Sequence, residues 1–494
     1  MRKQSGASRA MSIQKKFSSG VAWMSAGSWI EQAVNFAIFA LLARLLGVEA
    51  FGFLAMAAAF VLISEFLVRE SVSEILLTQE ALSPGRLNSV FWLLTVFGIA
   101  LSVTLYAVSG PIARFYDASE VGTLIVALSP TVLMIALTAV PVALLRRDMQ
   151  FRVLALRAVA GVVAGGVVGV GMALAGYGVW SLAGQRVTQV GINVIMAWAA
   201  VSWRPGADIS LHHIRDVFSF GHRMVGLRAA ELAAVQLPSI IVGVMLGPTQ
   251  AGLFSIAWRV VEIASFLVIT PLRMVAQPAF SSVARSGGQA TNLLVDIMRM
   301  AGLAVFPAFA GLAVLSEPAL IVLFGQKWAP AAPVLSVMSI FGMYLCIEKV
   351  QQTYCLAAGK VGVLALLAWC EVGLAATLIY LAVTFGLTAV ATAFVAAFLV
   401  VWPLRFRNLA TIANLGPVQL AGVHTLPMTM AVVMAVGVWL LSNWLAEPSN
   451  AVILGLGTLT GIVIFVVLAL LLSRDRLQLL RSFMRPASAP RTPT

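Results

Sequence analysis

The chain has 494 residues, of which 61% are hydrophobic and 10% are charged, and its mean hydropathy is +0.98. A soluble globular protein carries about 25% charged residues, so this composition excludes a soluble enzyme or binding domain and predicts an all-α, polytopic membrane protein. The net charge of +13 would favour nucleic-acid binding in a soluble chain, but the Lys and Arg residues lie in short segments between apolar runs, so we expect no nucleic-acid partner.

A membrane-spanning helix needs about 20 mostly apolar residues, bounded by Gly, Pro or charge clusters. The sequence predicts fourteen spans between a basic cytoplasmic arm (1–19) and a basic cytoplasmic tail (473–494). The apolar run after the arm is too long for a signal-peptide core, so we expect the first helix to remain as an anchor. The predicted spans are Gly20–Leu42, Phe51–Val72, Leu87–Ser109, Val121–Leu144, Val153–Ala175, Gly178–Val201, Val217–Leu246, Ala251–Val283, Leu293–Leu315, Ala331–Ala357, Val361–Phe385, Thr388–Leu404, Gln419–Trp444 and Ala451–Leu472.

The spans group into an N-lobe of six helices (20–201), an inter-lobe cytoplasmic loop (202–216), a C-lobe of six helices (217–404) and a final pair (405–472). An internal repeat supports this grouping and predicts a pseudo-two-fold relation between the lobes. Repeated lobes are typical of secondary transporters, whose binding site lies near the bilayer midplane. The residues that recur at an offset of 200 are Leu46, Gly47, Gly52, Ala57, Val61, Ile63, Phe66, Leu67 and Val68.

The distribution of basic residues predicts the orientation of the chain in the membrane. With both termini in the cytoplasm, the cytoplasmic segments hold roughly 21 Lys and Arg residues, whereas the opposite side keeps Arg114 and Lys327. An asymmetry of this size also supports an even number of spans.

Several ionisable residues lie roughly 12 to 21 Å inside the predicted spans, where a charge costs a few kcal/mol and normally faces water or another charge. We therefore expect a water-accessible cavity lined by polar stripes of the first two helices of each lobe. The alternative is that the i,i+3 pairs are intrahelical ion pairs that only hold the bundle together. The candidates for substrate binding are Arg228, Arg259, Glu31, Glu65, Glu231, Glu262, Arg273 and Asn35.

The sequence contains no motif for nucleotide binding, metalloprotease chemistry or an esterase nucleophile. Its three cysteines, Cys346, Cys355 and Cys370, lack zinc-ligand spacing, so we expect neither a metal nor another cofactor. The energy for transport must come from an ion gradient, of H⁺ or Na⁺, or from the concentration difference of the cargo. The sequence leaves these open.

Six segments in the expected order together resemble the polysaccharide transporter family of oligosaccharide flippases. This is the Wzx-like branch of the multidrug/oligosaccharidyl-lipid/polysaccharide exporter superfamily. The segments are ARLLGVEAFGFLAM (43–56), LLRRDMQFRVLA (144–155), GYGVWSLAGQ (176–185), IIVGVMLGPTQAGLFSIAWRV (240–260), LFGQKWAPAAPVLSVMS (323–339) and AAGKVGVLALLA (357–368).

The resemblance implies a bundle of two lobes that opens alternately to each face of the bacterial inner membrane. It also implies the cargo, an undecaprenyl-pyrophosphate-linked oligosaccharide that moves from the cytoplasmic to the periplasmic leaflet during exopolysaccharide, capsule or O-antigen assembly. Membrane lipids, a polysaccharide polymerase and the export machinery are the implied partners. Cationic cavity residues of this family change position between members, so the resemblance assigns none of them to this chain.

Three alternatives compete with this interpretation. A drug/cation antiporter of the same superfamily would use Glu31, Glu65, Glu231 and Glu262 for organic cations, but the paired arginines argue against a negative cavity. A flippase of the peptidoglycan precursor fits the segments less well than the polysaccharide branch does. A membrane enzyme acting on lipid-linked sugars would need a large outer loop, and every predicted outer loop is shorter than about 16 residues, so we expect no enzyme activity.

Overall fold

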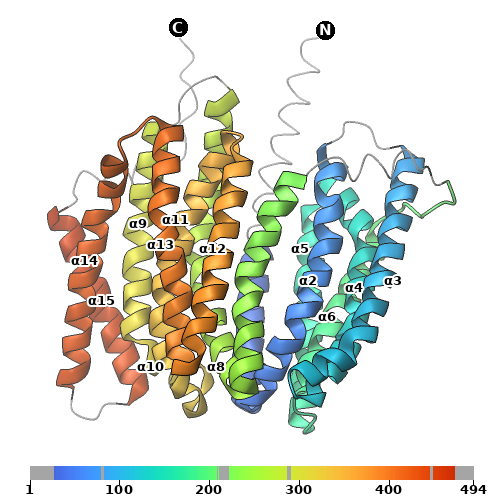
Figure 1. Cartoon of the computed structure of the whole chain (residues 1–494), viewed down its shortest axis with the longest axis horizontal. Helices are drawn as coiled ribbons and strands as arrows, with labels where there is room; N and C mark the ends of the chain where they lie inside the picture. Colours follow the sequence, from blue (N-terminus) through green and yellow to red (C-terminus); the bar gives the residue numbers. More distant parts are fainter. Residues whose placement is uncertain are drawn as a thin grey trace. The chain divides into compact units, whose positions relative to one another are not determined.

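The computed structural model describes residues 27–78, 83–208, 210, 222–285, 291–445 and 449–472. All regular secondary structure in this part of the chain is helical, which confirms the predicted all-α fold (Figure 1). The predicted basic arm (1–19), the basic tail (473–494) and most of the second half of the inter-lobe loop (202–216) lie outside the described residues.

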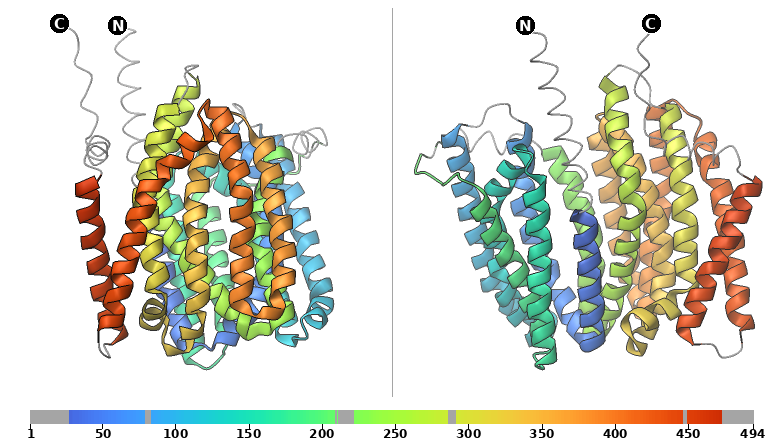
Figure 2. Two further views of the ribbon diagram at one scale, coloured as in Figure 1. Left: turned by 60° about the vertical axis from the view of Figure 1, so that its left-hand side comes forward. Right: turned by 180° about the vertical axis from the view of Figure 1, so that it is seen from behind.

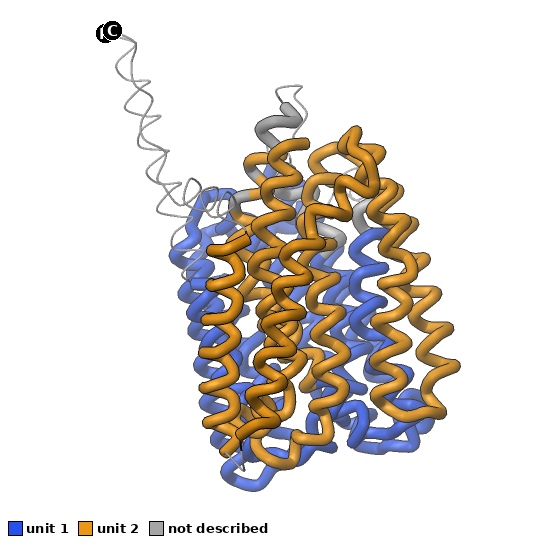
Figure 3. Tube along the Cα trace, turned by 90° about the vertical axis from the view of Figure 1, so that its left-hand side faces the viewer, with its two compact units in different colours: residues 1–255 blue, residues 256–494 orange. Residues whose placement is uncertain are grey.

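The chain divides into two compact units, residues 1–255 and 256–494 (Figure 3). This division lies within α8, and the lobe boundaries expected from the sequence stay predictions. The first unit contains helical residues 27–45, α2 (Val48–Thr78), α3 (Pro84–Phe115), α4 (Ser119–Arg147), α5 (Phe151–Leu174), α6 (Trp180–Ala200) and the first part of α8 (His222–Arg285). The second contains the rest of α8, α9 (Thr291–Val314), α10 (Ser316–Phe324), η1 (Gln326–Ala331), α11 (Ala332–Ala357), α12 (Val361–Ala382), η2 (Val383–Phe385), α13 (Leu387–Ala413), α14 (Pro417–Trp444) and α15 (Asn450–Leu472).

Eleven stretches of helix among the described residues are long and apolar enough to cross a membrane. One of them, Gly226–Met274, has 49 residues, which at 1.5 Å per residue is about twice the length that a bilayer core of about 30 Å accommodates. It contains a break at Gly247, whose φ of 82° and ψ of 179° are accessible to glycine and costly for other residues. This break separates two predicted spans, Val217–Leu246 and Ala251–Val283. The chain is therefore a multi-pass membrane protein.

The helices pack in the same order within each unit. In the first unit, α3 packs on α4, α5 packs on α6, and α4 also contacts α6. In the second, α9 packs on α11, α12 packs on α13, and α11 also contacts α13. The last two helices, α14 and α15, run side by side in the second unit, where α14 also packs on α9 (red in Figure 2).

The repeat in the sequence forms a reciprocal contact inside the first unit, where α2 begins and where α8 resumes after Gly247. A Cβ atom on Gly52 would overlap the backbone carbonyl of Pro248, and one on Gly252 would overlap that of Val48. Each contact is the other shifted by 200 positions, as expected for two equivalent segments that meet across a two-fold axis. Only glycine allows this approach of the two backbones.

We predict that Gly52→Val strongly destabilises the protein, because overpacking of this kind costs about 1 to 3 kcal/mol and here the obstacle is backbone. Thermal unfolding of the purified protein in detergent measures the effect. Gly110→Ala on α3 is the matched control, since a Cβ at Gly110 meets open space. Equal melting temperatures for Gly52→Val and the wild type would contradict the close contact.

Candidate functional site

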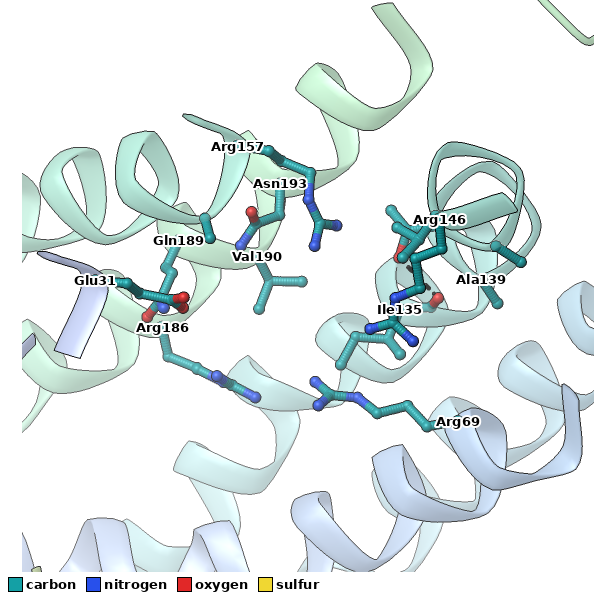
Figure 4. A pocket seen from close by; sticks show the side chains of 14 residues that line it. Glu31, Arg69, Ile135, Ala139, Arg146, Arg157, Arg186, Gln189, Val190 and Asn193 are labelled. Atoms are coloured by element: carbon teal, nitrogen blue, oxygen red, sulfur yellow. Dashed lines mark hydrogen bonds between the residues drawn. The ribbon is translucent and has the colours of Figure 1, made fainter. Parts of the chain in front are cut away.

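Four arginines from four helices of the first unit converge on one cavity of about 470 Å³ (Figure 4). They are Arg69 on α2, Arg146 on α4, Arg157 on α5 and Arg186 on α6. The carboxylate of Glu31, from helical residues 27–45, also lines the cavity, and it is the one acidic side chain among the lining residues that the structure describes. The guanidinium groups point toward the interior of the cavity.

The polar face of α6 follows from its sequence. Arg186, Gln189 and Asn193 lie at positions i, i+3 and i+7, which places them on one side of the helix, and all three line the cavity. The amides of Gln189 and Asn193 can both donate and accept hydrogen bonds. This face can therefore bind a charged group beside an uncharged polar one.

Glycines on α5 bring that helix close to the polar face of α6. A Cβ on Gly161 or Gly165 would overlap backbone carbonyls of α6, those of Gln189 and Gln185 respectively. Small residues at such positions let membrane helices approach each other closely. Since Arg157 lies one turn before Gly161 on the same face of α5, this packing places its guanidinium group over the cavity.

Glu65 lies behind the cavity lining and fixes two of the four arginines. Its side chain is 2% exposed, and its Oε2 atom accepts a hydrogen bond from Arg186 at 2.6 Å and is 3.5 Å from a terminal nitrogen of Arg69. Its Oε1 atom accepts a hydrogen bond from the Thr131 hydroxyl at 3.0 Å. A buried carboxylate needs such compensation, so Glu65 is a structural counter-charge that holds the arginines in place.

The other two arginines have less compensation. The buried Nε atom of Arg157 has no hydrogen-bond partner among the described residues. Arg157 repels Arg146 and Arg69, and Glu31 attracts it. The four guanidinium groups and the carboxylates of Glu31 and Glu65 together carry a formal charge of +2. Like charges that converge on one cavity repel each other, so the arrangement suits an anion with more than one negative charge.

The structure brings two of the sequence-predicted candidates, Glu31 and Glu65, to this cavity. Asn35 and Arg273 are half-buried and are not among its lining residues. Their role in binding stays a prediction.

The two i,i+3 pairs form the ion pairs that their spacing indicated. Arg228 and Glu231 are 2.9 Å apart in the first unit, and Arg259 and Glu262 are 2.7 Å apart in the second. This geometry fits the alternative interpretation, in which the pairs neutralise each other within a helix. Their proposed contact with cargo is a prediction that the geometry leaves open.

The sequence analysis did not select Arg146 and Arg157 as candidates, because both are among the roughly 21 basic residues that indicated the cytoplasmic side. In the structure α5 begins at Phe151, so Arg157 lies roughly 9 Å inside the helix. The signal that could have found it is its position four residues before Gly161, the first of three glycines at i,i+4 spacing in a helix. That spacing predicts a face turned toward another helix.

The second unit contains a buried ion cluster of a different kind. Arg405 on α13 is 6% exposed and binds Glu371 on α12 with two hydrogen bonds, of 2.5 and 2.6 Å, and Glu348 on α11 with one of 3.1 Å. The Tyr344 hydroxyl donates to Glu371 at 2.7 Å, and the Lys349 ammonium group is 3.4 Å from Glu348. Two cations and two carboxylates neutralise each other, so the cluster connects three helices without an excess charge.

The model of the polysaccharide biosynthesis protein family matches residues 41–333. The chain belongs to this family.

Two relatives of this family member are named for polysaccharide pathways. The succinoglycan biosynthesis transport protein ExoT of Rhizobium meliloti is 28% identical over 472 residues, which cover 92% of this chain and 94% of ExoT. The lipopolysaccharide biosynthesis protein WzxC of Escherichia coli is 22% identical over 339 residues, which cover 67% and 68%. The resemblance to the polysaccharide transporter family is thereby confirmed.

Solved structures show the same fold. The lipid II flippase MurJ in an inward closed conformation matches with a TM-score of 0.75 at 13% identity, over 92% of this chain and 99% of MurJ. An inward-facing transporter of the multidrug resistance MATE family matches with a TM-score of 0.61 at 16% identity, over 80% and 99%. At these identities the likeness concerns the fold alone, and it agrees with the superfamily expected from the sequence.

We predict that Arg405→Met destabilises the protein by about 3 to 5 kcal/mol, because two carboxylates remain buried without their main partner. The triple variant Arg405→Met, Glu348→Gln, Glu371→Gln should recover part of this loss, since it removes the unpaired charges together. Thermal unfolding in detergent measures both. A single variant as stable as the wild type would show that the cluster does not support the second unit.

Proposed function

We propose that the protein is a flippase that moves an undecaprenyl-pyrophosphate-linked oligosaccharide from the cytoplasmic to the periplasmic leaflet by alternating access. In this proposal Arg69, Arg146, Arg157 and Arg186 bind the pyrophosphate. The convergence of four guanidinium groups on one cavity, whose lining contains one carboxylate among the described residues, is the observation that carries the proposal. Family membership supports a polysaccharide precursor as the cargo.

The chemistry of the lining residues suits this cargo. Guanidinium groups bind phosphate oxygens through two parallel hydrogen bonds and keep their charge at any physiological pH. We call the cavity lined by Arg69, Arg146, Arg157 and Arg186 the arginine cavity. A pyrophosphate diester carries two negative charges, which can balance the formal charge of +2 that these arginines carry together with Glu31 and Glu65. Without such a site the headgroup would place two charges and many hydroxyls in hydrocarbon. The amides of Gln189 and Asn193 can bind sugar hydroxyls beside it.

The arginines are distributed along the helices in a way that suits entry from one face of the membrane. Arg146 lies one residue from the end of α4, whereas Arg186 lies 14 residues from the end of α6 at Ala200. Successive helices of the first unit place these ends on the same side, so the positions extend from roughly 2 to roughly 21 Å along the helices. The distribution of basic residues puts this side in the cytoplasm, where a headgroup would meet Arg146 first.

The sign of the cavity also separates the lead proposal from the drug/cation antiporter. An organic cation entering this cavity would meet four arginines and one lining carboxylate, which would repel it. Resistance to cationic dyes in cells that express the protein would revive the antiporter.

We predict that the double variant Arg157→Ala, Arg186→Ala stops polymer export in a host strain that lacks the wild-type gene. Each lost charge-assisted hydrogen bond costs about 1.5 to 3 kcal/mol, so the double variant should bind the pyrophosphate about a hundredfold to ten-thousandfold more weakly. The measurement is the amount of polymer outside the cell at matched protein levels in the membrane. Lipid-linked oligosaccharide should accumulate in the inner leaflet.

The comparison variant is Arg228→Ala, Arg259→Ala, which removes the two arginines expected from the sequence. Normal export in this variant and loss of export in the cavity variant would assign the headgroup to the arginine cavity. The reverse result would move the site to the ion pairs on α8 and contradict the proposal.

A further inference from the structure

Glu31 is the feature of the arginine cavity that anion binding alone does not explain. Its carboxylate lines the same cavity as Gln189 and Arg186 (Figure 4). Unlike Glu65, it accepts no hydrogen bond from any residue in the described part of the chain, and its main electrostatic partner is Arg157. A site built only to hold an anion as tightly as possible would not contain a carboxylate in its lining.

A charged group that faces a bound anion must either repel it or lose its own charge. With the headgroup among the arginines, the ionised form of Glu31 would face two negative charges in a partly desolvated cavity. Repulsion weakens the binding of the headgroup, and uptake of a proton by Glu31 removes the repulsion. By linkage, the factor by which the proton strengthens headgroup binding equals the factor by which the headgroup strengthens proton binding.

We infer that Glu31 is the release group of the arginine cavity: its ionised form opposes the bound headgroup and limits its affinity, and headgroup binding draws a proton onto Glu31. The inference rests on the proposed function. A translocation site must bind its cargo strongly enough to admit it and weakly enough to let it leave. The four arginines supply the first property, and the ionised carboxylate supplies the second.

The charged groups around Glu31 make the inference specific. Arg157 on α5 is the charged partner of Glu31, and Arg186 on α6, Arg69 on α2 and Arg146 on α4 line the same cavity. Glu65 lies behind the lining and is held by Arg186 and Thr131. A change in headgroup affinity between about pH 5 and pH 8 that is lost in Glu31→Gln therefore points to Glu31.

The test uses the full chain in lipid nanodiscs and a short-chain dialkyl pyrophosphate diester, which keeps its two charges across this pH range. Calorimetric titration measures its affinity and, in buffers of different ionisation enthalpy, the protons taken up. We expect Glu31→Gln to bind the diester about tenfold more tightly than the wild type at about pH 8, which corresponds to a coupling free energy of about 1.4 kcal/mol. The wild-type affinity should approach that of Glu31→Gln as the pH falls, and only the wild type should take up protons.

Glu120→Gln is the matched control, because Glu120 is an exposed carboxylate at the start of α4 and should keep the wild-type profile. If Glu31→Gln yields no folded protein, Glu31→Ala replaces it with the same expected profile. In the export assay Glu31→Gln should reduce polymer release despite its tighter binding. A merely structural role for Glu31 would not separate affinity from export in this direction.

The outcomes distinguish the inference from the proposed function. In one outcome the wild type binds the diester, Arg157→Ala does not, and Glu31→Gln shows the same pH profile as the wild type. This outcome overturns the role of Glu31 and leaves the pyrophosphate site intact. Absence of binding to the wild type at any pH overturns both.

Discussion

The cost of a charge in a membrane interior determines how each unit of this protein uses its polar residues. A buried charge must be paired, hydrated or matched by a bound ion of opposite sign. In the second unit Arg405 is paired with Glu371 and Glu348, and the cluster is closed and neutral. In the described part of the first unit four arginines line one cavity, with Glu65 behind the lining and Glu31 within it. We interpret the closed cluster as support for the bundle and the open one as the place where an anion binds.

Small residues allow the close helix contacts of the first unit. Polar side chains can meet inside a membrane bundle only if the helices that carry them come close, and glycine permits that approach. Gly161 and Gly165 bring α5 against α6, so Arg157 and the polar face of α6 line the same cavity. Gly52 and Gly252 do the same where α2 meets α8, in a contact that repeats the 200-residue offset of the sequence. The internal repeat is therefore visible in the packing as well as in the residues.

The sequence predicted the fold well because hydrophobic length is a strong and local signal. Runs of about 20 apolar residues located the helices, although some ends differ by up to nine residues, as in α13, which ends at Ala413 and not at the predicted Leu404. The break at Gly247 divides the 64-residue α8 into the two predicted spans. The site was harder. Glu31 and Glu65 were found because a carboxylate in mid-helix is anomalous, but Arg157 looked like an ordinary positive-inside charge. Arg228 and Arg259 attracted attention by their depth, and in the structure each forms an ion pair with a neighbour on its own helix.

The difference between these arginines shows what a single sequence lacks. Depth and spacing along one helix are readable from the chain, and they identify residues that need a partner. Whether the partner comes from the same helix or from another depends on which faces meet, and that is decided by packing. Arg259 finds Glu262 three residues away, whereas Arg186 finds Glu65 at a separation of 121 residues. For a transporter the distinction matters, because a charge neutralised within its own helix has little left to offer a ligand. A charge held from behind, as Glu65 holds Arg186, keeps the rest of its hydrogen-bonding capacity directed into the cavity.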